Sequence, residues 1–445
     1  MAKARFTAPK GMRDIMPDGL AVFRHIESVF RETCRLFAFR EIRTPHLEAT
    51  DLFCRTVGET SDIVEKEMYS LETKGGDRLS LRPENTAGVV RAYLEHGLHK
   101  RAPLQKLYYY GEQFRHESAQ KKRYREFTQA GVELIGSEHP QADVEVISLA
   151  VEFFRKLGLG DVRVELSTFG CPECRPAFRE ALLEYFKGHE EKLCRDCKRR
   201  LERNVFRLLD CKEDSCRALA AEAPAIDEFL DDNCRDHFQS VLAMLDNLKI
   251  AYSRNNRLVR GLDYYTRTIF EIFPSGGEGR QDALGAGGRY DGLAELLGGK
   301  AVPAVGFALG VDRIAQEIGL SVATGVIELA PPNTKSADHF YIRIYDKGAR
   351  SKAAVLGHEL RMKTVAEKQA IVEYDLAGKS PNAQFKAAKN SRARWCIIVD
   401  SAKDGYRLYD FKTLQEDGRY LTLEDILELI QAQIDKEGQE EETDK

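Results

Sequence analysis

The fold is decided by residues 107–115, LYYYGEQFR, together with residues 125–135, REFTQAGVELI. Both segments alternate apolar and polar side chains with a period of two, which is typical of β-strands. The short polar loop 117–124 joins them. We therefore expect two antiparallel strands connected by a hairpin loop.

One face of this strand pair is unusually polar. Residues two apart share a face of a strand, so the second strand places Arg125, Phe127, Gln129, Gly131 and Glu133 together. Burying such charges without partners would cost several kcal/mol, so we expect this face to meet a ligand or water. The alternative is an outer sheet face that is covered only by solvent.

The rest of the chain alternates between helical and extended patterns. Helical spacing of apolar residues occurs at 22–37, 142–157 and 310–318, and extended or apolar runs occur at 248–252, 266–273 and 302–309. A charged, cysteine-rich stretch interrupts this pattern, and Pro331 and Pro332 mark a linker to a segment in which strands and helices alternate. We expect a core at 1–165 and 237–328, an insertion at 166–236, an α/β domain at 333–433 and a solvated acidic tail at 434–445.

The composition excludes several classes of protein. The 67 Lys and Arg residues nearly balance the 71 Asp and Glu residues, and the hydrophobic share of 43% is that of a folded domain, which excludes disorder throughout the chain. No apolar run is long enough to span a bilayer, and the N-terminus lacks the apolar core of a signal peptide. We expect a cytoplasmic protein with reduced cysteines and no membrane partner.

Positive charge is nevertheless concentrated near the strand pair. Residues 100–125 contain eight Lys and Arg residues and two acidic ones, a local excess that suits phosphates. No P-loop sequence is present, so side chains must hold a phosphate, and Arg115, Arg260 and Arg313 are the candidates. Phe127 could stack on a base. A charged surface hairpin is the alternative interpretation.

Several segments together resemble the class II aminoacyl-tRNA synthetases. Residues 114–117 (FRHE) with 123–127 (RYREF) are similar to the second class motif, 310–313 (GVDR) to the third, and the helix ending near Pro45 to the first, dimer-forming motif. Residues 260–268 (RGLDYYTRT), 286–292 (AGGRYDG) and 81–86 (LRPENT) resemble segments of histidyl-tRNA synthetases. The resemblance extends from about Gly11 to the end of the C-terminal domain.

The resemblance implies an α+β fold, with a class II antiparallel sheet flanked by helices, an insertion domain that contacts the tRNA acceptor stem, and a C-terminal α/β domain that binds the anticodon. It implies a homodimeric enzyme that activates L-histidine with ATP and Mg²⁺ and transfers it to the 3′ end of tRNA(His). The alternative is the non-catalytic paralogue that regulates ATP phosphoribosyltransferase. That paralogue usually lacks the C-terminal domain and several signature residues.

The resemblance also assigns roles to individual residues. Arg115 and Arg260 are the expected catalytic residues, which stabilise charge at the α-phosphate without a protein nucleophile. The residues expected to bind histidine are Glu84, Asn85, Thr86, Arg115, Gln129, Glu133, Arg260, Tyr264 and Tyr265. The residues expected to bind ATP are Arg115, Glu117, Arg123, Phe127 and Arg313.

The cysteines of the insertion form a separate pattern. Cys171 and Cys174, and again Cys194 and Cys197, are pairs separated by two residues, a spacing typical of a structural tetrahedral zinc site. The family resemblance does not imply zinc. We therefore keep two interpretations, one zinc ion held by these four thiolates or reduced cysteines packed in a core.

Overall fold

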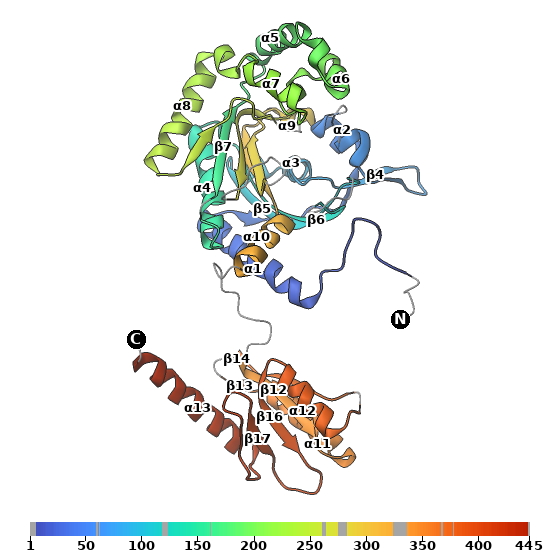
Figure 1. Ribbon diagram of the computed structural model, residues 1–445, viewed down its shortest axis with the longest axis vertical. Helices are drawn as coiled ribbons and strands as arrows, with labels where there is room; N and C mark the ends of the chain where they lie inside the picture. Colours follow the sequence, from blue (N-terminus) through green and yellow to red (C-terminus); the bar gives the residue numbers. More distant parts are fainter. Residues whose placement is uncertain are drawn as a thin grey trace. The chain divides into compact units, whose positions relative to one another are not determined.

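The computed structural model divides the chain into two compact units, Met1–Glu328 and Leu329–Lys445 (Figure 1). It describes residues 6–58, 61, 63–117, 123–160, 162–259, 264–274, 283–323, 336–365, 368–376 and 378–443. Among the helices described, none combines the length and apolar character needed to cross a membrane.

The first unit is built on an eight-stranded sheet within the described residues, in the order β1-β5-β6-β11-β10-β9-β7-β8. The two outermost pairs, β1 with β5 and β7 with β8, are parallel, and the other neighbours are antiparallel. This confirms the expected antiparallel class II sheet. The strands are β1 (Arg40–Glu41), β5 (Gln105–Phe114), β6 (Glu126–Ile135), β7 (Arg163–Thr168), β8 (Tyr252–Arg254), β9 (Thr266–Phe273), β10 (Gly285–Arg289) and β11 (Ala304–Gly310).

The hairpin expected from the sequence is β5 and β6, paired from Gln105 with Ile135 to Phe114 with Glu126. The run 266–273 is β9 as expected. One local interpretation was wrong. Leu248 caps the end of a helix, so the strand begins only at Tyr252. The glycine-rich residues Gly285–Arg289, for which the sequence patterns predicted no strand, form the largely buried strand β10.

Helices cover one face of the sheet. α1 (Pro17–Leu36), α4 (Pro140–Lys156) and α10 (Val311–Ala323) contact one another or the central strands on this side (Figure 1). The ring of Phe30 on α1 meets Phe153 on α4 at 5.3 Å and Tyr108 on β5 at 5.9 Å, both edge to face. Because Tyr108 points to the helices, its neighbour Tyr109 points to the opposite face.

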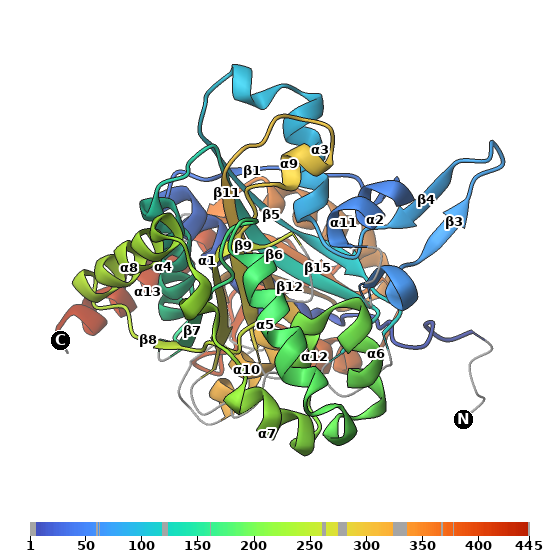
Figure 2. The ribbon, with the colours of Figure 1, turned by 90° about the horizontal axis from the view of Figure 1, so that it is seen from above.

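A second, smaller sheet with short helices also belongs to the first unit. The three-stranded sheet β2-β4-β3 consists of β2 (Leu47–Ala49), β4 (Arg78–Leu81) and β3 (Ser70–Glu72), and β3 and β4 extend outward as a pair (Figure 2). α2 (Thr50–Val57), a π-helical turn at Ile63–Glu67, α3 (Thr86–Glu95) and α9 (Leu293–Leu296) complete this group, and α3 contacts both α2 and α9.

The cysteine-rich segment forms a helical module with its own core. It contains α5 (Arg175–Lys187), α6 (Arg195–Arg203) and α7 (Asp214–Glu222), three 3₁₀ turns (Glu190–Lys192, Val205–Leu208 and Ile226–Phe229), and it leads into α8 (Asp232–Asn247). Phe178, Leu182, Phe186 and Val205 are buried in this core together with several of the cysteines. No strand is described between β7 and β8, so this module contains no sheet and its core is formed by the helices and turns.

The second unit is an α/β domain. Its main sheet has the order β15-β12-β16-β17-β18, in which β12 pairs in parallel with β15 and β16, and β16 pairs antiparallel with β17. The elements are β12 (Ser336–Ile344), α11 (Arg350–Arg361), β13 (Thr364–Val365), β14 (Lys368–Gln369), β15 (Ile371–Tyr374), α12 (Pro381–Asn390), β16 (Ala393–Val399), β17 (Arg407–Asp410), β18 (Gln415–Glu416), α13 (Leu423–Thr443) and a 3₁₀ turn at Lys347–Ala349.

Helix α13 runs through most of the segment that we expected to be a solvated acidic tail. Glu437 accepts hydrogen bonds from Arg394 at 2.7 and 2.9 Å, and Ile434 packs against the core of the second unit. Ile434 and Glu437 of this segment therefore have partners in the second unit that the charge pattern alone did not indicate.

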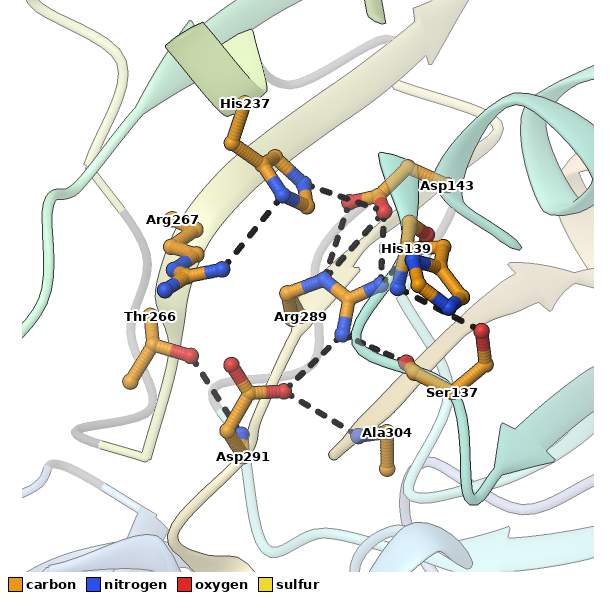
Figure 3. Close-up of polar contacts among 9 residues, drawn as sticks. All are labelled: Ser137, His139, Asp143, His237, Thr266, Arg267, Arg289, Asp291 and Ala304. Atoms are coloured by element: carbon orange, nitrogen blue, oxygen red, sulfur yellow. Dashed lines mark hydrogen bonds and ion pairs between the residues drawn. The ribbon is translucent and has the colours of Figure 1, made fainter. Parts of the chain in front are cut away.

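A buried ion network ties the far end of the large sheet to the helices (Figure 3). Arg289 on β10 and Asp143 on α4 have fully buried side chains and pair at 2.7 Å. Arg289 also donates to Asp291 at 3.1 Å and to the carbonyl oxygen of Ser137 at 2.8 Å, while His237 on α8 contacts Asp143 at 3.2 Å. Burial acts to raise the pKa of Asp143, but the hydrogen bond with His237 and the charge of Arg289 outweigh it and lower that pKa.

Replacing one member of this network should be costly. Removing Arg289 leaves the Asp143 carboxylate buried without its cation, so we expect Arg289→Ala to lower the free energy of unfolding of the first unit by about 3–5 kcal/mol. The control Arg155→Ala removes a pair with Glu152 in which the arginine side chain is 66% exposed, and should cost about 0.5 kcal/mol or less.

Urea unfolding followed by circular dichroism measures both variants. The single tryptophan, Trp395, lies in the second unit, so its fluorescence transition serves as an internal reference that we expect both variants to leave unchanged. Equal stabilities for Arg289→Ala and Arg155→Ala would show that the buried network contributes no more than a surface pair.

Candidate active site

The face of the sheet opposite α1, α4 and α10 carries a cavity of about 280 Å³. Its walls combine acidic, basic, aromatic and small residues from β6, β9, β10 and β11 and from the segments that flank these strands. The residues that line it are Glu84, Thr86, Arg115, Glu117, Arg123, Tyr124, Phe127, Gln129, Glu133, Tyr264, Tyr265, Glu271, Ala283, Leu284, Gly285, Ala286, Tyr290, Gly306, Phe307, Ala308, Gly310, Asp312 and Arg313.

Strand register produces the floor of this cavity. Directly paired residues of neighbouring strands share a face, and on this face β11 and β10 present almost only glycine and alanine. One row across the sheet runs from Gly131 to Ala308 to Ala286, and the next runs from Glu133 to Gly306 to Gly288. The floor is low because these positions lack large side chains, which leaves room above them.

Two glycines of the floor are required by close approach of the cavity's own side chains. A Cβ atom at Gly306 would lie 1.9 Å from the Glu133 carboxylate, and one at Gly131 would lie 2.3 Å from the ring and hydroxyl of Tyr109. Glu133 and Tyr109 therefore lie flat over the floor, and any side chain at these two positions would displace them.

The closed end of the cavity is a chain of hydrogen bonds centred on Glu133. The Thr86 hydroxyl donates to its carboxylate at 2.8 Å, and the Tyr290 hydroxyl donates to its other oxygen. Glu84 caps the start of α3, where it accepts from the amides of Thr86 at 2.7 Å and Ala87 at 2.9 Å. Tyr264, Tyr265 and Tyr290 are buried around these groups and their rings contact one another.

Burial dominates the electrostatics at this end. It raises the pKa of Glu133 to about 8, although the hydrogen bonds from Tyr290 and Thr86 act in the opposite direction. Burial likewise raises the pKa of Glu84, against the amide hydrogen bonds that favour its charged form. The site thus holds two buried carboxyl groups with raised pKa values, and a ligand that bonds to them would change those pKa values.

The other end of the cavity carries the cations. The Arg115 guanidinium lies 5.4 Å from the centre of the Phe127 ring, and its Nε donates to the carbonyl oxygen of Pro83 at 2.8 Å. Arg123 donates to Glu117 at 3.0 Å, and Arg313 donates to the carbonyl oxygen of Ala283 at 2.7 Å. Each of these hydrogen bonds fixes the orientation of one guanidinium group, which carries five N–H donors in all.

Asp312 joins three elements beside these cations. Its carboxylate accepts from Arg13 at 2.7 Å and from the amide of Thr128 on β6 at 2.8 Å. Arg13 in turn stacks on the Tyr124 ring at 3.8 Å and donates to its hydroxyl. The start of α10, the end of the β5–β6 hairpin and the N-terminal segment are thereby held together.

One buried acceptor facing the floor, Oε1 of Gln129, has no hydrogen-bond partner among the described residues. A buried polar atom without a partner costs roughly 1–3 kcal/mol, so such atoms are expected where a ligand completes the hydrogen bonding.

Most residues chosen from the sequence lie in the cavity wall, but Asn85 does not. Asn85 is buried at the start of α3, and its side chain accepts from Thr44 at 2.7 Å instead of lining the cavity. Arg260 lies outside the described residues. The sequence interpretation assigned no role to Tyr290, Glu271 or Asp312, although Tyr290 and Asp312 stand within the quoted motifs.

The prediction of one zinc site made from Cys171, Cys174, Cys194 and Cys197 was wrong in its pairing. Cys194 and Cys197 lie with Cys211 and Cys216, whereas Cys171 and Cys174 lie with Asp231 and Cys234. Two-residue spacing identifies a ligand pair, but only the packing of the helices decides which pairs meet.

Comparison with known proteins gives consistent results. The family described as histidyl-tRNA synthetase matches residues 11–314. Histidine–tRNA ligases from Geobacter sulfurreducens and Desulforudis audaxviator are 43% and 45% identical to the chain; each alignment covers 88% of it, and 91% and 90% of the relative.

Solved structures agree with these relatives. The apo histidyl-tRNA synthetase of S. aureus is 30% identical with a TM-score of 0.75, covering 96% of this chain and 100% of the other. A Bacillus halodurans protein described as an ATP phosphoribosyltransferase regulatory subunit/histidyl-tRNA synthetase is 23% identical with a TM-score of 0.61, covering 89% and 99%. The latter likeness shows the fold alone.

The raised pKa of Glu133 leads to a test on the ligand-free protein. Its folded-state pKa of about 8 lies above the ordinary value of 4.5, so the stability linked to this proton is complete below about pH 4.5 and is lost as the pH rises through 8. Glu133→Gln cannot ionise. Its free energy of unfolding relative to the wild type should therefore increase by on the order of 4 kcal/mol between about pH 5 and about pH 9.

Urea unfolding at several pH values measures this difference. Glu138→Gln, which changes an exposed carboxylate just beyond the same strand, is the matched control and should run parallel to the wild type. A parallel course for Glu133→Gln as well would mean that Glu133 does not bind its proton more tightly in the folded protein.

Proposed function

The chain belongs to the histidyl-tRNA synthetase family, and from this premise we propose which residues of the cavity carry out the family's reaction. It is an aminoacyl-tRNA synthetase that activates histidine with ATP and joins it to tRNA. The observation that carries the assignment of the site is the cavity itself, with buried carboxyl groups at one end and arginines beside an aromatic ring at the other.

We place histidine at the closed end. An imidazole offers two ring nitrogens, and Glu133 with Tyr265 matches the family's contacts to them. Glu133 already accepts from Thr86 and Tyr290 and has further lone pairs for a ring N–H. Glu84, Thr86 and Gln129 would receive the α-amino group, for which the unpaired Oε1 of Gln129 is suited. Tyr264 packs behind Tyr265 with ring centres 4.8 Å apart.

We place ATP at the open end. The adenine would stack on Phe127 near the Glu117–Arg123 pair, and Arg115 and Arg313 would hold the α- and γ-phosphates. An arginine that is already oriented by a backbone carbonyl loses little entropy when it binds a phosphate, which favours Arg115 for this role. Asn85, which faces Thr44, would act by supporting the start of α3.

In the first step a carboxylate oxygen of histidine attacks the α-phosphorus, and the bond to the β-phosphate oxygen breaks to release pyrophosphate. No protein nucleophile is required, so catalysis depends on placement and on positive charge. Arg115 would supply that charge from one side and Arg260 from the other. In the second step the 3′-hydroxyl of tRNA attacks the carbonyl carbon, and AMP leaves.

Magnesium would support the pyrophosphate leaving group. The carboxylate of Glu271 lines the cavity and provides the oxygen ligands that this hard cation prefers. We assign Mg²⁺ to this neighbourhood on the chemistry of these donors.

We also propose that the second unit binds the anticodon, that the helical module of residues 166–236 contacts the acceptor stem, and that the chain works in the cytoplasm as a homodimer. These proposals follow the family resemblance, and α1 with the segment through Pro45 corresponds to the dimer-forming motif. Sedimentation velocity should give twice the mass of one chain. A species of single-chain mass at micromolar concentration would contradict the dimer.

Exchange of labelled pyrophosphate into ATP tests the catalytic assignment. The wild type should catalyse exchange only with histidine present, and Arg115→Ala should lower the rate by roughly 10²–10³, since it removes charge stabilisation in the transition state. Binding of tRNA should change little. Arg155→Ala, which alters an arginine with a 66% exposed side chain, is the control.

The outcome also separates the enzyme from its regulatory paralogue. A folded wild-type dimer without exchange activity would favour the non-catalytic regulator. Equal rates for Arg115→Ala and the wild type would remove Arg115 from the mechanism while leaving the family assignment intact.

A further inference from the structure

We propose that the helical module of residues 166–236 holds two structural zinc ions, each in its own four-ligand site. Cys194, Cys197, Cys211 and Cys216 form the first, here called the thiolate site. Cys171, Cys174, Asp231 and Cys234 form the second, here called the mixed site. Together the two sites use seven of the ten cysteines of the chain.

The thiolate site has the dimensions of a tetrahedral zinc centre. All four sulfur atoms lie within 4.8 Å of one another, and the Sγ atoms of Cys194 and Cys211 are 3.8 Å apart. A zinc–sulfur bond of about 2.3 Å gives a tetrahedron whose edges are about 3.8 Å. The cysteines are not disulfide-bonded, so four free sulfurs converge on one point.

The mixed site is similar but replaces one thiolate by a carboxylate. The Sγ atoms of Cys171 and Cys174 are 3.5 Å apart, and Oδ2 of Asp231 lies 3.1 and 3.4 Å from them. The other oxygen, Oδ1, accepts from the amide of Cys234 at 2.7 Å and caps α8. These contacts orient the carboxylate, because the start of α8 holds one oxygen and the other oxygen lies against the two sulfur atoms.

Backbone amides support negative charge on these sulfurs. The amide of Cys197 donates to the Sγ of Cys194 at 3.4 Å, that of Cys194 to the Sγ of Cys216 at 3.2 Å, and that of Asp231 to the Sγ of Cys174 at 3.3 Å. Cys174, Cys194 and Asp231 also stand at the N-terminal ends of α5, α6 and α8, where the helix dipole favours anions. Hydrogen bonds from neighbouring groups to the ligand atoms commonly orient the ligands of a metal ion.

Packed, neutral cysteines are the competing interpretation, since several of these residues belong to the module's hydrophobic core. An apolar core gains nothing from gathering four thiols, or three thiols and a carboxylate, at one point. Metal binding explains that convergence in both groups. Sulfur-rich tetrahedral ligand sets select zinc among the abundant divalent ions.

The two ions would join segments that no sheet connects. The thiolate site links the start of α6 to the stretch before and at the start of α7, and the mixed site links the start of α5 to the start of α8. A module of this size has a small core, and structural zinc contributes folding free energy directly.

The mixed site also lies where the module leaves the large sheet. The amide of Arg267 donates to the carbonyl oxygen of Gly170 at 2.8 Å, and Arg175 donates to the carbonyl oxygen of Tyr265. The thiolate site adjoins a surface hollow lined by Arg195, Arg200, Arg207 and Lys212 and also by the acidic residues Asp196, Asp210 and Glu213. Resting on the proposed function, the zinc ion would fix the four cations in a position suited to the phosphates of the acceptor stem.

Metal analysis of the full-length protein tests the proposal. Inductively coupled plasma mass spectrometry after exhaustive dialysis should give about two zinc ions per chain. Cys211→Ser and Cys234→Ser should each lose one ion, and Cys54→Ser, a change of a cysteine on α2 outside both groups, should keep two. One ion or none per wild-type chain, or iron in place of zinc, would overturn the proposal.

X-ray absorption spectroscopy on the wild type measures the number of sulfur and oxygen ligands per zinc. This test does not depend on whether the variants fold. Seven sulfur and one oxygen ligand shared by two ions predict an average of about 3.5 sulfurs and 0.5 oxygen per zinc. Coordination by sulfur alone would remove Asp231 as a ligand and overturn the mixed site. Zinc content and pyrophosphate exchange are measured separately, so a failure of one proposal is distinguishable from a failure of the other.

Discussion

The pairing of β6 with β11 and β10 is the constraint on which the active site depends. It sets Glu133 beside Gly306 and Gly131 beside Ala308, so small residues of β10 and β11 form the floor of the cavity. A shift of β6 by one residue would turn Val132 toward the cavity and Glu133 toward the helices. The cavity is therefore a consequence of sheet register. The strands form its floor, and the segments that flank them form its walls.

Buried charge serves two different purposes in the first unit. Arg289 and Asp143 are matched by each other and by neighbouring groups, which makes them a fixed connection between β10 and α4. Glu133 and Glu84 are buried with hydroxyl and amide donors and no buried cation bonded to them among the described residues, and burial raises the pKa of both. The first arrangement stabilises the fold, while the second leaves capacity for a ligand.

Local pattern predicted the parts of this protein that depend on period and chain direction. The β5–β6 hairpin, β9 and the polar face of residues 127–133 followed from alternation. The proposal that Arg115 and Arg313 hold phosphates followed from the absence of a P-loop and from the motifs. Sequence patterns did not predict contacts between residues that are far apart in the chain. Asn85 turns to Thr44, Glu437 pairs with Arg394, and the glycines of β10 lie in a strand because their neighbours do.

The sequence by itself determined the chemistry that is available: the family motifs, the alternation that makes the sheet, and cysteines in pairs separated by two residues. Only the tertiary structure decided which of these groups meet. Cys194 and Cys197 find Cys211 and Cys216, and Cys171 and Cys174 find Asp231 and Cys234, because α5, α6 and α8 pack around a core that brings their N-terminal ends to two separate points. Spacing along a chain limits local geometry, whereas contacts between distant segments are set by the burial of apolar surface.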